Sequence, residues 1–157
     1  MTTEHMNGDL MTIALEEATA AAKRHEVPVG VVLVDAHGEI LSQTGNRIVE
    51  LHDPTAHAEL LAIREAAAKL GNERLVDCDL YVTLEPCPMC AQAISFARIR
   101  RLYYGAADIK GGGVDNGPRI YSQPTCHHAP EVYGGIGETK AAKLLKSFFE
   151  SRRQATE

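Results

Sequence analysis

The sequence predicts an α/β fold, a three-layer α/β/α sandwich around a five-stranded mixed sheet. Segments with helical spacing of apolar residues alternate with short β-rich runs along the whole chain. The first such run is apolar at almost every position, which is typical of a strand covered on both faces. The length of 157 residues suits one domain over 1–157, with residues 1–9 expected as a flexible N-terminal tail.

The first elements are a helix and a pair of strands. Apolar side chains at helical spacing place a helix over residues 10–25. The apolar run at 29–34 is followed by the turn Asp35-Ala36-His37-Gly38, after which residues 39–44 return as a second strand. The turn is short enough to predict a hairpin.

Capping residues mark both ends of a second helix. Asp53 provides an N-cap side chain, and Pro54 suits the first helical position, where the backbone N–H has no intrahelical partner. We expect the helix to run to about Leu70, because Gly71 can adopt the left-handed conformation that ends helices.

The second half of the chain alternates further strands and helices with one long loop. Residues that favour β-structure predict strands over 79–84, 101–105 and 131–133. A helix begins near Pro86–Pro88 and runs to about Ala97, and a closing helix runs from 137 to about 153. The segment 106–130 is rich in loop formers, and its Gly111–Gly113 run is expected to be mobile.

Composition excludes several classes of protein. A hydrophobic content of 45% and a charged content of 24% are those of a soluble globular chain. The longest apolar stretch, around Val31–Val34, is too short to cross a membrane, and residues 1–10 lack the features of a secretory signal. Four cysteines, two of them in one C-x-x-C, argue against a disulfide framework. We therefore expect a cytoplasmic protein with no membrane partner.

Two short fragments contain the candidate chemistry: His57-Ala58-Glu59 and Pro86-Cys87-Pro88-Met89-Cys90. One imidazole and two thiolates are three ligands for one Zn²⁺, and they leave a fourth tetrahedral position open for water, as in catalytic sites. Cysteines three residues apart lie on one face of a helix start, whose dipole favours thiolates. Glu59 is then the candidate proton carrier for a hydrolytic deamination.

Simpler interpretations of these fragments are a redox C-x-x-C pair or half of a structural zinc site. No second C-x-x-C completes a four-cysteine site, and Cys78 and Cys126 are not spaced like one. A redox pair usually lacks an upstream H-x-E, so the joint occurrence favours catalytic zinc. The geometry leaves one difficulty. Residues two apart on a helix point about 200° apart, so His57 and Glu59 meet one water only if the metal lies near the helix end.

Charge is unevenly distributed along the chain. The net charge of −5 argues mildly against a nucleic-acid partner. However, residues 1–60 have three basic and ten acidic side chains, whereas residues 98–157 have ten basic and six acidic ones. Local positive surface attracts phosphates whatever the net charge of the chain. Solvated helix faces explain the same pattern, so charge alone leaves both interpretations open.

With these residues in place, the chain resembles the cytidine deaminase-like superfamily, and within it the bacterial tRNA-specific adenosine deaminases. The resemblance covers about residues 10–153. Five segments resemble the family in order: Glu26-Val27-Pro28-Val29-Gly30, Gly45-Asn46-Arg47, His52 to Glu59, Leu80 to Cys87 and Ser147 to Arg153. It implies conversion of the wobble adenosine of a tRNA anticodon to inosine. It also implies one Zn²⁺ per subunit and a homodimer that binds the tRNA anticodon stem-loop, with no DNA expected.

The resemblance also implies roles for individual residues. The zinc ligands are His57, Cys87 and Cys90, and the proton carrier is Glu59. Asn46 matches the asparagine that holds the target nucleoside, although an asparagine after Gly45 also suits a turn.

Further matches concern the RNA. Asp108 and Lys110 match a loop that touches the anticodon nucleotides, and the alternative is an ordinary polar loop. Phe149 and the basic end of the closing helix could contact RNA. Equally, Phe148 and Phe149 could anchor that helix, and we expect one of the two to do so.

Two other functions stay open. Pro88 gives Pro-Cys-Pro-Met-Cys, a form also found in deaminases of free purine bases such as guanine. A free-base or nucleoside deaminase of the guanine or cytosine type is therefore the alternative enzyme. A non-catalytic, zinc-stabilised RNA-binding module is a third possibility, and it would not need Glu59. Cys126-His127-His128 could suggest a second metal, but adjacent histidines are more typical of a surface or RNA-facing feature.

Overall fold

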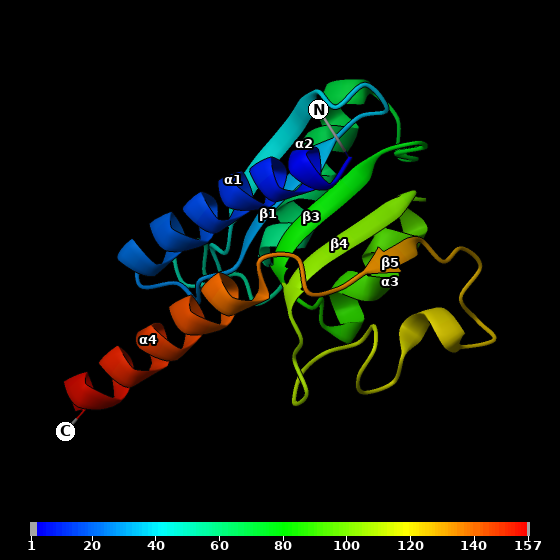
Figure 1. Cartoon of the computed structure of the whole chain (residues 1–157). Coiled ribbons are helices and arrows are strands. Elements are labelled where there is room, and N and C mark those ends of the chain that lie inside the picture. Colours follow the sequence, from blue (N-terminus) through cyan, green and yellow to red (C-terminus); the bar gives the residue numbers. More distant parts are fainter. Residues whose placement is uncertain (1–2, 157) are drawn as a thin grey trace.

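The computed structural model describes residues 3–156 and has the predicted α/β/α architecture (Figure 1). Its elements in chain order are α1 (Thr3–Lys23), β1 (Gly30–Val34), β2 (Ile40–Gly45), α2 (Ala58–Leu70), β3 (Asp79–Leu84), α3 (Pro88–Phe96), β4 (Arg101–Ala106), the 3-10 helix η1 (Ile120–Ser122), β5 (Glu131–Tyr133) and α4 (Glu138–Thr156). Among the described residues, no helix combines the length and apolar character needed to span a bilayer.

The five strands form one mixed sheet in the order β2-β1-β3-β4-β5. β1 pairs antiparallel with both β2 and β3, whereas β3, β4 and β5 run parallel. Gly30 pairs with Gly45, and Leu84 pairs with Ala106. Because β1 runs against its neighbours, the segment before β1 and the segments after β2, β3 and β4 all meet at one edge of the sheet.

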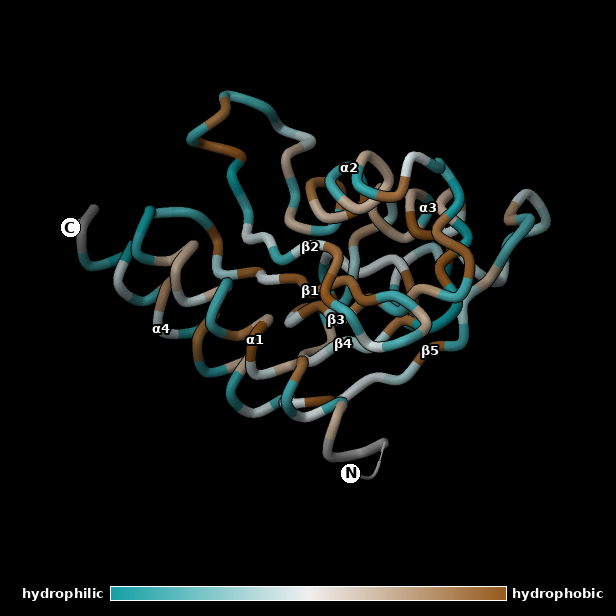
Figure 2. Tube along the Cα trace, turned by 90° about the horizontal axis from the view of Figure 1, so that it is seen from above, coloured by the Kyte–Doolittle hydropathy of each residue, from teal (hydrophilic) through white to brown (hydrophobic). Residues whose placement is uncertain are grey.

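Each face of the sheet is covered by two helices. Figure 2 shows α1 and α4 on one face and α2 and α3 on the other. Successive side chains of a strand point to opposite faces. Val31, Leu33, Leu80 and Val82 belong to the core under α2 and α3, and Val32, Val34, Tyr81 and Tyr103 pack with α1. Burial on both faces explains why β1 has no polar side chain and why β3 is mostly apolar or aromatic.

The predicted start of the second helix was wrong. α2 begins at Ala58 rather than after Asp53. The carboxylate of Asp53 instead closes a local turn, in which its Oδ1 accepts hydrogen bonds from the backbone N–H of Thr55 at 2.9 Å and from the Thr55 hydroxyl at 2.7 Å. The predicted C-cap is confirmed, because Gly71 has φ 66° at the end of the helix.

The first helix also begins earlier than predicted. Residues 3–9, expected as part of a tail, form the first turns of α1, whereas residues 1–2 lie outside the described residues. This segment lacks a clear apolar stripe, so its sequence does not indicate a helix. Instead, Asn7 Oδ1 accepts a hydrogen bond from the Tyr81 hydroxyl of β3 at 2.5 Å, which ties the start of α1 to the sheet.

Candidate metal centre

The two predicted motif fragments lie at the starts of two helices on the same edge of the sheet. His57 is the N-cap of α2, with extended backbone (φ −68°, ψ 148°), and Cys87 is the N-cap of α3. Cys90 follows in the first turn of α3, where Pro88 occupies the first helical position. The Thr44 hydroxyl at the end of β2 donates to the Ala58 carbonyl at 2.7 Å, which holds the start of α2 against the sheet.

The three side chains converge at distances that suit one metal ion. His57 Nδ1 lies 3.6 Å from Cys87 Sγ and 3.5 Å from Cys90 Sγ, and the three donor atoms all lie within 4.8 Å of one another. A tetrahedral zinc ion with ordinary Zn–S and Zn–N bonds separates nitrogen and sulfur ligands by about 3.6 Å. No other such group of three or more His, Cys, Asp or Glu side chains occurs among the described residues. The donor set therefore fits zinc.

The chemical state of Cys87 also suits a metal ligand. Hydrogen bonding from Cys90 and from His57 lowers the pKa of the Cys87 thiol to about 4. The thiolate is the form that binds metals. The N-terminal end of α3 supports the same charge state, because helix N-termini favour anions.

Glu59 shares the cavity with His57, which resolves the geometric difficulty noted for the sequence. Because His57 precedes the helix in extended conformation, the two side chains are not separated by a full two-residue helical step. Glu59 is only 4% exposed, and burial raises the pKa of its carboxyl to about 7. A carboxyl with this pKa can both accept and release a proton near neutral pH.

The cavity beside the cluster has a volume of about 190 Å³. Apolar walls with a few convergent polar groups are typical of a site for a small organic ring. Its lining residues are Val27, Val29, Asn46, Ile48, His57, Glu59, Leu84, Glu85, Cys87 and Asp108. The cavity thus brings two of the three candidate metal ligands, His57 and Cys87, together with Asn46, Glu59 and Asp108.

Asn46 also has a structural role in the wall of this cavity. Its Oδ1 accepts a hydrogen bond from the Ala58 N–H at 2.7 Å, and its Nδ2 donates to the Val27 carbonyl at 3.1 Å. These bonds join the end of β2, the segment before β1 and the start of α2. Asn46 can therefore stabilise the turn and also bind a substrate. The two bonds use Oδ1 and one N–H of the side-chain amide, and the second amide N–H remains for a substrate.

Replacing Asn46 with alanine should lower the free energy of unfolding by about 1–3 kcal/mol, because the buried N–H of Ala58 would lose its acceptor. Urea unfolding followed by circular dichroism measures the change. Asn72→Ala is the matched control, since Asn72 accepts a comparable bond from Arg74 N–H at 3.0 Å on the exposed surface. Equal effects of the two substitutions would show that Asn46 does not hold α2 in place.

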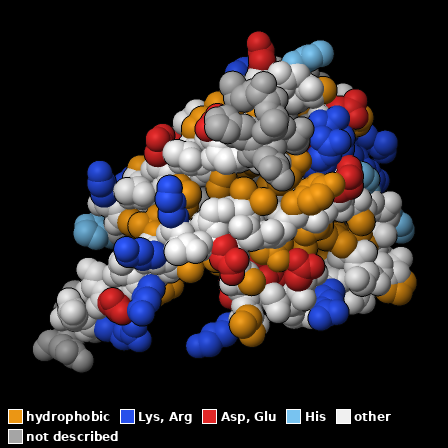
Figure 3. Space-filling model, in the orientation of Figure 1, with side chains coloured by type: hydrophobic (Ala, Val, Ile, Leu, Met, Phe, Trp, Pro, Cys, Tyr) orange, Lys and Arg blue, Asp and Glu red, His pale blue; other side chains and the backbone are white. Residues whose placement is uncertain are grey.

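The residues predicted to contact RNA do not all lie at the cavity. Asp108 lines the cavity, whereas Lys110 is exposed and does not. Phe148 is buried and Phe149 is 45% exposed, so one of the two anchors α4, as expected. The Arg152 guanidinium carbon lies 5.0 Å from the centre of the Phe148 ring. Lys and Arg side chains gather along the projecting α4 (Figure 3).

Cys126 and His128 have bonding partners in the loop around them. The Cys126 thiol donates to the His128 carbonyl at 3.2 Å, and His128 Nε2 lies 2.7 Å from the Ile99 carbonyl. The Ser95 hydroxyl also donates to the His128 carbonyl, at 2.6 Å. These contacts fasten the segment before β5 to α3, while His127 is exposed.

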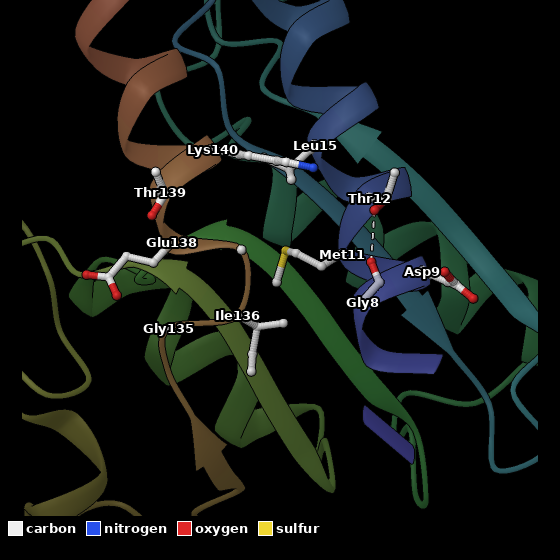
Figure 4. A pocket seen from close by; sticks show the side chains of 11 residues that line it. Gly8, Asp9, Met11, Thr12, Leu15, Gly135, Ile136, Glu138, Thr139 and Lys140 are labelled. Atoms are coloured by element: carbon white, nitrogen blue, oxygen red, sulfur yellow. Dashed lines mark hydrogen bonds between the residues drawn. The ribbon is translucent and has the colours of Figure 1, made fainter. Parts of the chain in front are cut away.

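A larger cavity, of about 630 Å³, lies elsewhere, between α1 and the start of α4 (Figure 4). Its polar side chains include Asp9, Thr12, Glu138 and Lys140, and Figure 4 shows Asp9 and Glu138 pointing away from each other. Among the described residues that line it, none is a cysteine or a histidine. The metal-binding chemistry therefore belongs to the smaller cavity.

Glu85 is a site residue that the sequence analysis missed. It lines the cavity, is 2% exposed and precedes Pro86-Cys87 directly. Burial opposes ionisation, yet hydrogen bonds from Asp108, Asn116 and Val114 lower the pKa of the Glu85 carboxyl below its usual value. An acidic residue directly after the buried strand β3 was the available signal, because buried carboxylates need several donors.

Comparison with known proteins agrees with this geometry. Residues 5–106 match the family model of the cytidine and deoxycytidylate deaminase zinc-binding region. The chain is 59% identical over 143 residues to the tRNA-specific adenosine deaminase of Agrobacterium fabrum, covering 91% of this chain and 93% of that protein. A solved structure from studies of A-to-I editing by tRNA:A34 deaminases at the wobble position of transfer RNA is 60% identical, with a TM-score of 0.86, over 87% of this chain and 99% of that chain. The guanine deaminase of Bacillus subtilis is more distant, at 32% identity and a TM-score of 0.62 over 85% of both chains.

Proposed function

This chain belongs to the cytidine and deoxycytidylate deaminase zinc-binding family, in its tRNA-specific adenosine deaminase branch, and we propose that it converts the wobble adenosine of a tRNA anticodon to inosine. The observation that supports this most directly is the convergence of His57, Cys87 and Cys90 beside the buried carboxyl of Glu59. The high identity to tRNA-specific relatives over most of the chain favours an RNA substrate over a free base.

His57, Cys87 and Cys90 would hold one zinc ion in each subunit. A zinc ion bound there supplies a water that is acidic enough to attack near neutral pH. Two thiolates and a neutral imidazole leave little net positive charge at the centre, so the neighbouring carboxyl has more of the proton transfer to perform.

Glu59 would then act as the proton carrier of the hydrolysis. It accepts a proton from the attacking water and delivers it to N1 of the adenine ring, as the C6–O bond forms. It next takes the proton of the new C6 hydroxyl and passes it to the exocyclic nitrogen. The C6–N bond then breaks, C6=O forms, and ammonia leaves. The raised pKa of Glu59 suits both directions of transfer.

The RNA would bind across the open side of this cavity. The target base must leave the loop stack to reach the site, which costs little from a single-stranded loop. The basic side chains of α4 would attract the phosphates, and Figure 1 shows α4 running beyond the carboxyl ends of β3 and β4.

We also propose that the protein is a cytoplasmic homodimer. Met89 and Phe96 on α3 are apolar and exposed, which favours a subunit interface at α3.

The test is product analysis on a panel of substrates. Anticodon stem-loop RNA with adenosine at the wobble position should yield inosine on nucleoside digestion and mass spectrometry, whereas a stem-loop with guanosine there should not change. Free guanine, cytosine and cytidine complete the panel. Turnover of the stem-loop at sub-saturating concentration should fall steeply as salt rises, because phosphate binding releases counterions.

Other outcomes identify the alternatives. Turnover of guanine without inosine formation, and without a steep salt dependence, would show a free-base deaminase like the more distant structural relative. Stem-loop binding without any product would show a zinc-stabilised binding module.

A further inference from the structure

Glu85 is the centre of a hydrogen-bond cluster that holds the loop 108–116 beside the cavity. Its Oε1 accepts from the Asp108 N–H at 3.0 Å and from Asn116 Nδ2 at 2.6 Å. Its Oε2 accepts from the backbone N–H groups of Val114, Asp115 and Asn116, at 3.2, 3.0 and 3.1 Å. One buried carboxylate thus binds both ends of the loop.

The same loop packs directly on the metal-binding segment. The Gly113 N–H donates to the Pro86 carbonyl at 2.8 Å, and a Cβ on Gly113 would lie 2.5 Å from the Pro88 nitrogen. A Cβ on Gly112 would lie 2.5 Å from Glu85 Oε2. Both glycines are buried, so they serve close packing in this structure and give no support to the mobility expected of the Gly111–Gly113 run.

This arrangement links Asp108 to the metal centre through Glu85. Asp108 lines the cavity, and its backbone N–H donates a hydrogen bond to Glu85 Oε1. Glu85 itself is two residues from Cys87 at the end of β3, so the loop and the metal ligand take their positions from the same short segment. Among the described residues, the Glu85 carboxylate bonds only to this loop, whereas the three donor atoms belong to His57, Cys87 and Cys90. A change in the carboxylate should therefore move the cavity wall more than the donor atoms.

We propose that Glu85 is a positioning residue for substrate, which fixes the loop 108–116 against the start of α3 so that Asp108 forms part of the wall that receives the RNA. This inference rests on the proposed function for its substrate and on the hydrogen bonds for its mechanism. Glu85 does not act on the reacting atoms in this role. Its loss should weaken substrate binding more than the chemical step.

Glu85→Gln is the test substitution, because it keeps the shape and replaces one acceptor oxygen with an NH₂ group. Both carboxylate oxygens accept from backbone N–H groups, so the NH₂ group would face a donor whichever oxygen it replaces. Asp79→Asn is the matched control. Asp79 is a buried carboxylate at the opposite end of the same strand, where Arg100 binds it at 3.0 Å. Both variants are compared with the unmodified chain.

The first readout does not depend on activity. Lys110 lies exposed within the loop, so limited trypsin digestion after Lys110 measures local opening of the loop. We expect Glu85→Gln to accelerate this cleavage by about tenfold or more, since it removes charge-assisted bonds. Cleavage after Lys23 at the end of α1 serves as the internal reference and should not change. Asp79→Asn should leave cleavage after Lys110 unchanged.

The second readout is the split between KM and kcat for stem-loop RNA, with rates expressed per bound zinc. Glu85→Gln should raise KM by about tenfold and change kcat by less than about threefold. A variant that is merely less stable would lose active protein and keep its KM. Unchanged loop cleavage, or a loss confined to kcat, would overturn the proposal.

Asn116→Ala keeps the proposal testable if Glu85→Gln does not fold. It removes only the Nδ2 bond to Glu85 and should shift loop cleavage and KM in the same direction by a smaller factor. Failure of the proposed function gives a different pattern. In that case the unmodified chain makes no inosine, and loop cleavage alone decides whether Glu85 holds the loop.

Discussion

Replacing Glu59 with alanine or glutamine is expected to lower the rate of inosine formation by about 10³-fold or more, while zinc stays bound and the fold persists. Positioned proton transfer contributes about 10²–10⁴-fold to enzymatic rates, and here one carboxyl serves several transfers. Glu59 supplies none of the three metal-donor atoms, so metal content should not change. Single-turnover assays on stem-loop RNA, with zinc measured by atomic absorption, give both quantities.

Glu65→Ala is the control for the Glu59 variants. Glu65 lies on the same helix but is exposed to solvent, so its substitution should leave the rate within about twofold. Glutamine is the more informative of the two Glu59 substitutions, because it retains volume and hydrogen bonding and removes only the exchangeable acidic proton. A fully active Glu59→Gln variant would contradict the proton-carrier role.

Replacing Cys90 with alanine should remove both zinc and activity. Cys90 supplies one of three donor atoms and is fully buried, so the site would keep only two ligands. We expect the affinity for zinc to fall by more than about 100-fold, since even loss of supporting contacts around a metal costs 10- to 100-fold. Because bound metal stabilises the folded state, the variant should also melt at a lower temperature than the zinc-loaded protein.

Cys126→Ser is the matched control, because Cys126 is a cysteine outside the cluster, and its thiol contacts only Ser95 of α3 and the His128 carbonyl among the bonds described. It should retain stoichiometric zinc and activity. Treating the unmodified protein with a chelator should reproduce the Cys90→Ala result, and added Zn²⁺ should restore inosine formation. Full zinc content in Cys90→Ala would contradict the assignment of this ligand.

The pattern of apolar residues was sufficient to predict the sheet, because its central strands are buried on both faces. β1 has no polar side chain and β3 is mostly apolar or aromatic, and the order of helices and strands then leaves few ways to layer them. Capping signals were less reliable. Asp53 and Pro54 satisfied the rules for a helix start, but the Asp53 carboxylate made a local turn, a competing use of the same residue type.

The candidate metal ligands could be predicted from sequence for a different reason. His57, Cys87 and Cys90 are chemically distinctive, and their local backbone positions at two helix starts follow from short-range spacing. Glu85 was not accessible in this way, because its role depends on five donors that are 23 to 31 residues away in sequence. The structural role of Asn46 could not be predicted from sequence either, because its bond from the Ala58 N–H depends on the contact between the end of β2 and the start of α2.

The zinc-edge anomalous difference map of a crystal of this protein tests the central claim most directly. We expect one peak per subunit among His57 Nδ1, Cys87 Sγ and Cys90 Sγ, about 2.0 Å from the nitrogen and about 2.3 Å from each sulfur. Glu59 should face that peak without ligating it. A map without a peak there, or with a peak held by other side chains, would contradict the account.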